Sequence, residues 1–196
     1  MNVLVTAASK QGATGEIAEA IARTLRKRGL DTTVLAPERV EDVRGYDAFV
    51  IGSAVYMGHW LEPAIGLVHR FGAAMGDRPV WLFSSGPVGD PKRKLVQQMG
   101  ADPVELPALL AQTRAREHRM FAGKLVKEHV NRAQRISLSI FRGFAGDFRN
   151  WSEIDRWASQ IADALVGRGV HKDAEPLSQL RALSTSFPHE IRREGP

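Results

Sequence analysis

Residues that could do chemistry gather first between an apolar run, 3–7, and a segment of helical periodicity, 16–28. The loop that joins them contains Ser9, Lys10, Gln11, Gly12, Ala13 and Thr14. Hydroxyl groups donate hydrogen bonds to an oxyanion, glycine lets the backbone approach it, and lysine adds positive charge. Because the start of a helix has unpaired N–H groups and the positive end of the dipole, the loop predicts a phosphate site. A simple tight turn into a capped helix is the alternative.

Other phosphate-binding motifs do not describe this loop. It lacks the Gly-Lys-Ser/Thr ending of a Walker loop and the G-x-G-x-x-G of dinucleotide-binding folds. The spacing Ser-x-x-Gly-x-Thr across residues 9–14 instead resembles the phosphate loop of flavodoxins, which holds a monophosphate mainly with hydroxyls and backbone amides.

Two further loops follow apolar runs at 47–52 and 79–85. The residues that these loops contribute to the expected site are Ser53, Ala54, Val55, Tyr56, Met57, Gly58, Ser85, Gly86, Pro87 and Gly89. In a parallel sheet such loops emerge at the same end of the strands, which is where ligands bind. None of the three loops holds a cluster of carboxylates or histidines, so we expect no metal site.

The remaining elements alternate between strand and helix. We expect strands at 3–7, 31–36, 47–52, 79–85 and 117–125, a short helix or turn within 37–46, and helices at 16–28, 61–71, 92–99, 105–115, 127–143 and 152–166. Alternation of this kind predicts an α/β fold, a doubly wound five-stranded parallel sheet with helices on both faces. Periodicity is lost after residue 170, so we expect one domain over 1–170 and a flexible tail over 171–196.

Composition narrows the function classes. The 196 residues contain no cysteine, which excludes disulfides, thiolate catalysis and cysteine-ligated metal. The net charge is +5, but the basic residues are dispersed and no nucleic-acid motif accompanies them, so we expect no nucleic-acid partner. The chain begins directly in a strand and has no apolar run long enough to span a bilayer, so we expect a cytoplasmic protein without a secretory signal.

Four segments carry a family resemblance, at 9–14, 52–58, 121–125 and 146–151. With them, residues 1–167 resemble the flavodoxin-like superfamily, and most of all the flavodoxin-domain family that includes menaquinone-dependent protoporphyrinogen dehydrogenase. The Phe-Ala-Gly-Lys strand and the Asp-x-x-x-Trp sequence before the last helix are fairly specific to that family. The resemblance implies a sheet of order 2-1-3-4-5 and FMN as the cofactor.

The resemblance also assigns roles to the three loops. It implies that the FMN phosphate is held by Ser9, Gln11, Gly12, Ala13 and Thr14. It places the flavin ring between one wall of Ser53, Ala54, Val55 and Tyr56 and another of Ser85, Gly86, Pro87 and Gly89. Lys10 either pairs with the phosphate or is a solvated loop lysine. Tyr56 or Trp60 could stack on the ring.

The basic charge departs from the acidic flavodoxins that carry electrons. It favours a propionate-bearing porphyrin, a quinone near an anionic membrane surface, or an acidic redox partner protein. A peripheral membrane contact is therefore one interpretation. Apolar residues within 136–148 could form a lip over the flavin, although packing in an ordinary helix explains them equally well.

Single residues near the loops have less specific interpretations. His59 could assist proton transfer, although a lone loop histidine is usually only a surface residue. Trp81 and Trp157 are expected in the core, and Trp151 as a packing residue at the start of the last helix. No histidine–acid pair can be placed beside Ser84 and Ser85 from the sequence, which argues against a hydrolase.

Three functions follow from these patterns. The leading hypothesis is an FMN-dependent oxidoreductase similar to protoporphyrinogen dehydrogenase, acting on a small redox substrate such as a porphyrinogen or a quinone. The second is an electron carrier without turnover of its own. The third is a flavin-free binding module that keeps the fold.

Overall fold

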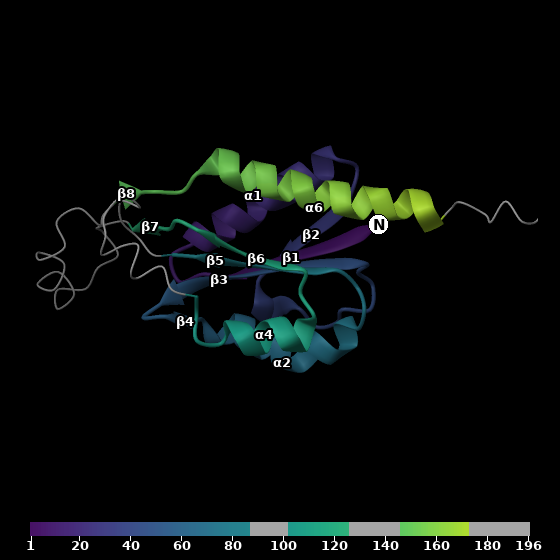
Figure 1. Cartoon of the computed structure of the whole chain (residues 1–196). Coiled ribbons are helices and arrows are strands. Elements are labelled where there is room, and N and C mark those ends of the chain that lie inside the picture. Colours follow the sequence, from purple (N-terminus) through teal and green to yellow (C-terminus); the bar gives the residue numbers. More distant parts are fainter. Residues whose placement is uncertain (87–101, 126–145, 173–196) are drawn as a thin grey trace, which may run out of the picture. The chain divides into compact units, whose positions relative to one another are not determined.

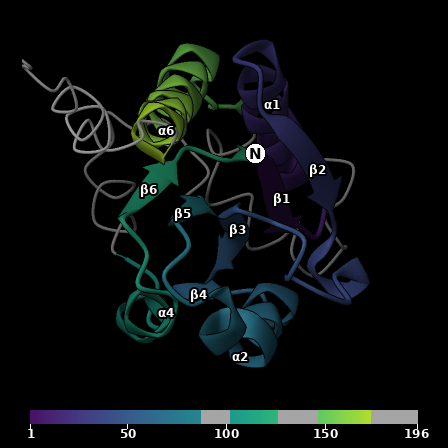
Figure 2. The same ribbon diagram turned by 90° about the vertical axis from the view of Figure 1, so that its right-hand side faces the viewer.

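The computed structural model describes residues 1–86, 102–125 and 146–172. Its central sheet has five parallel strands, in the order β2-β1-β3-β5-β6 (Figures 1 and 2). Their bounds are β1 (Asn2–Ala8), β2 (Asp31–Leu35), β3 (Ala48–Tyr56), β5 (Val80–Ser85) and β6 (Glu117–Phe121). Counted along the chain, the parallel strands have the predicted order 2-1-3-4-5, so the predicted fold class is confirmed.

Helices cover both faces of this sheet. Figure 2 shows α1 (Ala13–Lys27) and the first part of α6 (Trp151–Lys172) on one face, with α2 (Glu62–Met75) and α4 (Leu106–Thr113) on the other. A short 3-10 helix, η1 (Pro37–Arg39), follows β2. Residues from Met1 to Ala162 form one compact unit, and Asp163–Pro196 form a second. The predicted boundary at residue 170 stays a prediction.

The two faces of the sheet have different cores. On the α2 and α4 face, aliphatic side chains of the strands pack against Leu67 and Leu109, all of them buried. On the opposite face, the rings of Phe83, Phe121 and Trp157 pack edge to face or tilted, with centroids 5.5–6.2 Å apart. These arrangements suit aromatic quadrupoles. The burial predicted for Trp157, like that for Trp81, is confirmed.

Several predicted boundaries were wrong. The predicted loop over 53–60 is instead a β-hairpin, since β3 continues to Tyr56 and pairs with β4 (His59–Trp60). The fifth strand ends at Phe121, and β7 (Lys124–Leu125) pairs antiparallel with β8 (Gly146–Asp147). The helices predicted at 92–99 and 127–143 lie outside the described residues. So do residues 136–145 of the expected lip over 136–148, and residues 173–196 of the tail predicted over 171–196.

Most helix ends lie at residues whose types favour the start or end of a helix. α1 begins at Ala13, three residues earlier than predicted, and Gly29 follows its end with φ +83°. Asn150 caps α6, because its Oδ1 accepts a hydrogen bond from the Glu153 N–H at 3.2 Å. Trp151 does not pack as predicted: it is 42% exposed, and the Arg149 guanidinium lies 4.4 Å from the centre of its ring.

Candidate functional site

The first two predicted loops and the described start of the third meet at one end of the sheet. Because β1, β3 and β5 are adjacent and parallel, Ala8 lies beside Ser53, and Ala54 beside Ser85. Ala8 and Ser85 are the last residues of β1 and β5, and β3 continues from there into its hairpin. The carboxyl ends of the strands thus bring together the turn before α1, the hairpin, and Gly86 after β5. Pro87 and Gly89 lie outside the described residues.

The turn before α1 exposes the start of a helix. Gly12 is the N-cap and has a left-handed backbone, φ +81°, which glycine adopts without strain. A Cβ at this position would meet nothing within 4 Å, so the space in front of the turn is open. The Ser9 Oγ accepts a hydrogen bond from the Thr14 N–H at 3.3 Å, and the Thr14 side chain itself is buried. Lys10 and Gln11 are exposed beside the turn.

This geometry fits a phosphate group. The positive end of the α1 dipole faces the open space. The Thr14 N–H, one of the first backbone amides of the helix, already donates a hydrogen bond to the Ser9 hydroxyl oxygen, and it could donate to a phosphate oxygen in the same way. A phosphate could also take hydrogen bonds from the side chains of Ser9 and Gln11. Since Thr14 is buried, the structure favours its amide over its hydroxyl as a donor.

The hairpin of β3 and β4 forms the second part of the site. Met57 and Gly58 have φ angles of +51° and +81° at its tip, the signature of a type I′ turn. Beneath the tip, Ser53 is fully buried, and its hydroxyl donates to the Ala54 carbonyl and accepts from the Leu61 N–H, both at 2.9 Å. Ser53 therefore supports the hairpin with its side chain and is not exposed to a ligand.

The described part of the second predicted wall, Ser85 and Gly86, lies against the hairpin. Gly86 donates its N–H to the Phe121 carbonyl at 2.9 Å, and a Cβ on Gly86 would lie 3.4 Å from the Val55 carbonyl oxygen. Gly86, directly after β5, thus lies close to the backbone of the hairpin. Ser85 and Ala54 are almost fully buried at this point, and Tyr56 is 38% exposed.

Lys10 connects the turn to the hairpin. Its ammonium nitrogen lies 4.4 Å from the centre of the Tyr56 ring, a cation–π distance. Next to this pair lies an open groove of about 570 Å³, which is lined by Ser9, Lys10, Tyr56 and the start of α2 and also carries the carboxylates of Glu38 and Glu62. Lys10 therefore covers one face of the Tyr56 ring, which a stacked aromatic ligand would have to share or displace.

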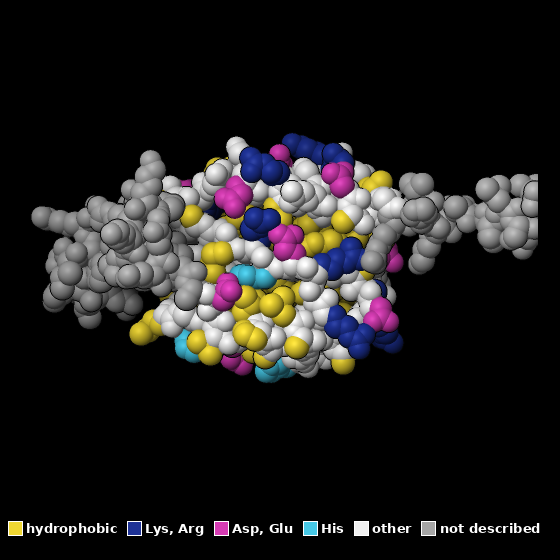
Figure 3. Space-filling model, in the orientation of Figure 1, with side chains coloured by type: hydrophobic (Ala, Val, Ile, Leu, Met, Phe, Trp, Pro, Cys, Tyr) yellow, Lys and Arg dark blue, Asp and Glu magenta, His cyan; other side chains and the backbone are white. Residues whose placement is uncertain are grey.

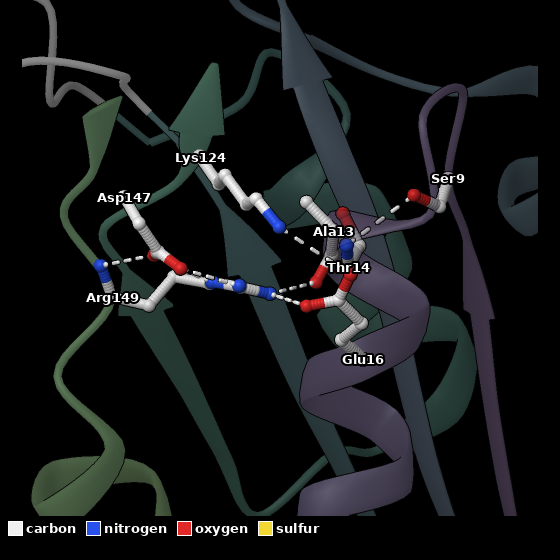
Figure 4. Close-up of polar contacts among 7 residues, drawn as sticks. All are labelled: Ser9, Ala13, Thr14, Glu16, Lys124, Asp147 and Arg149. Carbon is white, nitrogen blue, oxygen red and sulfur yellow. Dashed lines mark hydrogen bonds and ion pairs between the residues drawn. The ribbon is translucent and has the colours of Figure 1, made fainter. Parts of the chain in front are cut away.

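Arg149 is a site residue that sequence reasoning missed (Figure 4). Its guanidinium donates to the Ala13 carbonyl at 3.1 Å and pairs with Glu16 at 2.7 Å, both on α1. It also forms a two-pronged pair with Asp147, at 2.6 and 2.8 Å. The Lys124 ammonium lies 3.6 Å from the other Glu16 oxygen. The side chain of Arg149 is only 2% exposed.

The charges in this cluster hold one another ionised. Hydrogen bonding to Arg149 lowers the pKa of Glu16 and of Asp147 below the ordinary carboxyl values. The bond to Asp147 is the main cause that raises the pKa of Arg149. Both carboxylates therefore remain negative at neutral pH, and each has a cation beside it.

His59 lies on the rim of the hairpin. Its Nδ1 is 2.5 Å from one oxygen of Glu105, whose other oxygen accepts the Trp60 N–H at 3.1 Å. The histidine is exposed and paired, which supports a role in fixing the hairpin to the start of α4. Its predicted part in proton transfer stays a prediction.

A histidine and an acid, which the sequence alone did not place beside Ser84, do lie next to it in the structure. The Nε2 of His118 lies 2.8 Å from the Ser84 hydroxyl, and Asp102 lies 3.7 Å from the other ring nitrogen. Yet Ser84 is fully buried, and its oxygen also accepts the Trp60 indole N–H at 2.7 Å. Burial lowers the pKa of His118, which favours the neutral ring. This cluster braces the hairpin and offers no exposed nucleophile.

Surface charge does not gather into one basic region on the face shown in Figure 3. Lys and Arg side chains of the described residues are interspersed there with Asp and Glu. Among the described residues, no group of three His, Asp or Glu side chains is placed to hold a metal ion. Within the same part of the chain, no helix has the length and apolar character needed to cross a bilayer.

The segments that build this site match a known family. Residues 4–149 match the family model described as flavodoxin domain. The chain belongs to the flavodoxin domain family. It is therefore a flavodoxin-like protein of a flavin-binding family. The narrower resemblance to protoporphyrinogen dehydrogenase has no such support. Comparison with curated proteins gave no match.

Solved structures share the fold of this family member at low sequence identity. A flavodoxin from the domain Archaea is 17% identical, with 84% of this chain and 98% of that chain covered and a TM-score of 0.57. A mutant flavodoxin from Pseudomonas aeruginosa is 15% identical, with 84% and 99% covered and a TM-score of 0.56. Rubredoxin oxygen:oxidoreductase from Desulfovibrio gigas is 16% identical, with 85% and 36% covered and a TM-score of 0.54. These likenesses show the fold alone.

Proposed function

We propose that this flavodoxin-family protein binds FMN and is an oxidoreductase that passes electrons from a reduced substrate to a quinone or another acceptor. The observation that carries the proposal is the open turn at Gly12, where the start of α1 faces the same end of the sheet as the hairpin and Gly86. A phosphate group and a planar ring need these two features side by side. When bound, FMN supplies the redox chemistry.

The chain's own residues would bind and orient the cofactor. The turn over 9–14 would hold the phosphate with backbone amides and exposed polar side chains. The hairpin, from Ala54 to Gly58, would form one wall for the ring, and Ser85 and Gly86 the described start of the other. Tyr56, which is 38% exposed, would shield one side of the ring from water. Because nearby groups tune a flavin's potential, the exposure of this wall matters for function.

The substrate class follows from resemblance and charge. The chain resembles the family that includes protoporphyrinogen dehydrogenase, and its net charge of +5 suits a substrate that carries carboxylates. We therefore infer a porphyrinogen or a quinone as the redox substrate. Incubating the purified, FMN-loaded protein with each, and following steady-state turnover, tests this inference. Failure of both substrates would leave the cofactor proposal intact and remove the substrate class.

Binding of FMN is tested with two matched glycine variants. Gly12 and Gly29 lie at opposite ends of α1, have φ angles of +81° and +83°, and have open space where the methyl group of an alanine would lie. Gly12→Ala and Gly29→Ala should therefore cost similar stability, about 1–2 kcal/mol for a left-handed alanine. Only Gly12→Ala should weaken FMN binding, by about 10-fold or more, because its methyl group faces the phosphate turn.

Absorbance and titration give the measurement. Apoprotein titrated with FMN should develop bound-flavin absorbance and quench flavin fluorescence, and Gly29→Ala should titrate like the unchanged protein. An equal loss of FMN affinity in both variants would mean that backbone strain, and not the phosphate turn, controls FMN binding. If the unchanged protein takes up no FMN at all, the proposed function is wrong.

A second candidate is an electron carrier without turnover of its own. Its support is that residues 4–149, most of the chain, match the flavodoxin domain family. A carrier of this kind should accept electrons from a partner reductase yet show no steady-state oxidation of a porphyrinogen or reduction of a quinone. The same turnover assay separates the two functions.

A further inference from the structure

One side chain joins two segments that are far apart in the sequence, the β7–β8 ribbon and the start of α1. Arg149 follows β8, yet it donates to the Ala13 carbonyl and pairs with Glu16 in the first turn of the helix (Figure 4). These two residues flank Thr14, whose N–H donates to the Ser9 hydroxyl. Arg149 therefore holds the very turn that faces the proposed phosphate.

Because Glu16 is negatively charged, its contact with Arg149 affects how well a second anion can bind at the start of α1. A carboxylate in the first turn of a helix interacts favourably with the helix dipole, but it opposes a second anion at the same place. Its two oxygens pair with Arg149 at 2.7 Å and with Lys124 at 3.6 Å. Arg149 makes the shorter of these two contacts and is nearly buried, so its charge is little screened by water.

The ribbon also fixes the direction of the guanidinium. Asp147 binds it through Nε and Nη2 with two hydrogen bonds, which leaves Nη1 to reach Ala13 and Glu16. Such a planar two-pronged pair restricts rotation of the side chain. Thus Asp147 orients Arg149, and Arg149 orients and neutralises the acidic first turn.

We propose that Arg149 is a positioning residue that gives the site its preference for a flavin carrying a phosphate. By neutralising Glu16 and holding the Ala13 carbonyl, it keeps the amides of the turn available to a phosphate dianion. This inference rests on the proposed function, because it concerns the same cofactor site.

The test compares two flavins that differ only in the phosphate. FMN and riboflavin share the ring and the ribityl chain, so the ratio of their dissociation constants isolates the phosphate contribution. Arg149→Gln should weaken FMN binding by about 10- to 100-fold, because losing this charge-assisted hydrogen bond leaves Glu16 without its closest cation next to the phosphate. Riboflavin binding should change by less than about 2-fold, since it makes no use of the phosphate turn.

A second variant separates the charge effect from structural damage. Glu16→Gln in the Arg149→Gln background removes the carboxylate that would otherwise be left without its closest cation. The double variant should recover at least about 5-fold of the lost FMN affinity, because repulsion between carboxylate and phosphate is gone. If riboflavin binds too weakly to measure, this recovery of FMN affinity still decides between a charge effect and structural damage.

The chain offers a matched control in Arg78. Its guanidinium likewise holds backbone carbonyls, those of Val43 and Tyr46, but on a loop that contributes nothing to the site. Arg78→Gln should lower stability and leave the FMN-to-riboflavin ratio unchanged. If Arg149→Gln behaves like Arg78→Gln, or if Glu16→Gln recovers nothing, Arg149 is merely structural and the inference is overturned. Absence of FMN binding in the unchanged protein would instead overturn the proposed function, and this inference with it.

Discussion

Gly52→Ala should destabilise the protein, because Phe83 occupies the space that the new methyl group needs. A Cβ on Gly52 would lie 2.1, 2.3 and 2.5 Å from three ring carbons of Phe83. Carbon atoms in contact normally lie about 3.5–4.0 Å apart, so the ring or the strand would have to retreat by more than about 1 Å. The absence of a side chain at Gly52 on β3 thus leaves room for the Phe83 ring of the neighbouring strand.

Phe83 has little room to retreat. It is fully buried, and its ring packs against Phe121 and Trp157 with centroids 6.1 and 6.2 Å away. Forcing extra volume into a core of this kind costs about 1–3 kcal/mol. The displaced strand also continues into the hairpin, so the same substitution should disturb the proposed wall of the flavin site.

Urea unfolding followed by tryptophan fluorescence measures the effect, since Trp157 lies in the disturbed cluster. Gly66→Ala is the matched control, because a Cβ at Gly66, in α2, would meet nothing within 4 Å. It should raise the free energy of unfolding by about 0.5–1 kcal/mol through helix propensity. Equal or greater stability of Gly52→Ala than of the unchanged protein would refute the packing argument.

Two further predictions concern a buried histidine and a helix cap. Burial lowers the pKa of His118 below 6.5, so the unfolded chain binds more protons there and stability should fall as pH drops below about 6.5. His118→Gln should flatten this slope between about pH 5 and 6.5 in urea titrations, a range above the ordinary carboxyl pKa values. Asn150→Ala should lower the free energy of unfolding by about 1 kcal/mol, since it removes the cap on Glu153, and thermal unfolding checks this; an unchanged midpoint would contradict the cap.

Local patterns predicted most of the fold. Apolar runs without alternation marked strands that are buried on both faces, and the spacing of Ile17, Ile21 and Leu25 marked the buried side of α1. Both signals depend only on neighbouring residues. For the same reason the turn over 9–14 could be placed at the start of a helix before its geometry was known.

The hairpin could not be predicted in the same way. Its tip, Met57-Gly58, is not one of the usual Asn-Gly or Asp-Gly pairs of a type I′ turn, and Met57 adopts a positive φ that non-glycine residues seldom take. Small residues such as Ser53 and Ala54 resemble a loop until the neighbouring strands are placed. Their burial comes from β1 and β5, which lie on either side of β3.

Side-chain contacts between segments far apart in the sequence also could not be predicted. Arg149 and Glu16 are separated by most of the chain, and nothing in either segment indicates the other. The same holds for Ser84, His118 and Asp102, whose proximity results from the pairing of β5 with β6 and from the position of the chain before α4. The one signal in the sequence was the charged pair Asp147 and Arg149 just before the cap of α6. This pair does not indicate that Arg149 also contacts Glu16.

The two parts of the proposed site are held in different ways. The hairpin is fixed by hydrogen bonds within it and to its neighbours: the Leu61 N–H donates to Ser53, the Trp60 indole donates to Ser84 in β5, and Glu105, before α4, pairs with His59 and accepts the Trp60 N–H. Because this wall is already ordered before binding, a flavin ring that binds against it loses little free energy to ordering side chains or backbone. The phosphate turn, in contrast, depends on charges supplied from the β7–β8 ribbon. Changes in the hairpin should therefore affect both flavins alike, whereas changes in the ribbon should affect only the one that carries a phosphate.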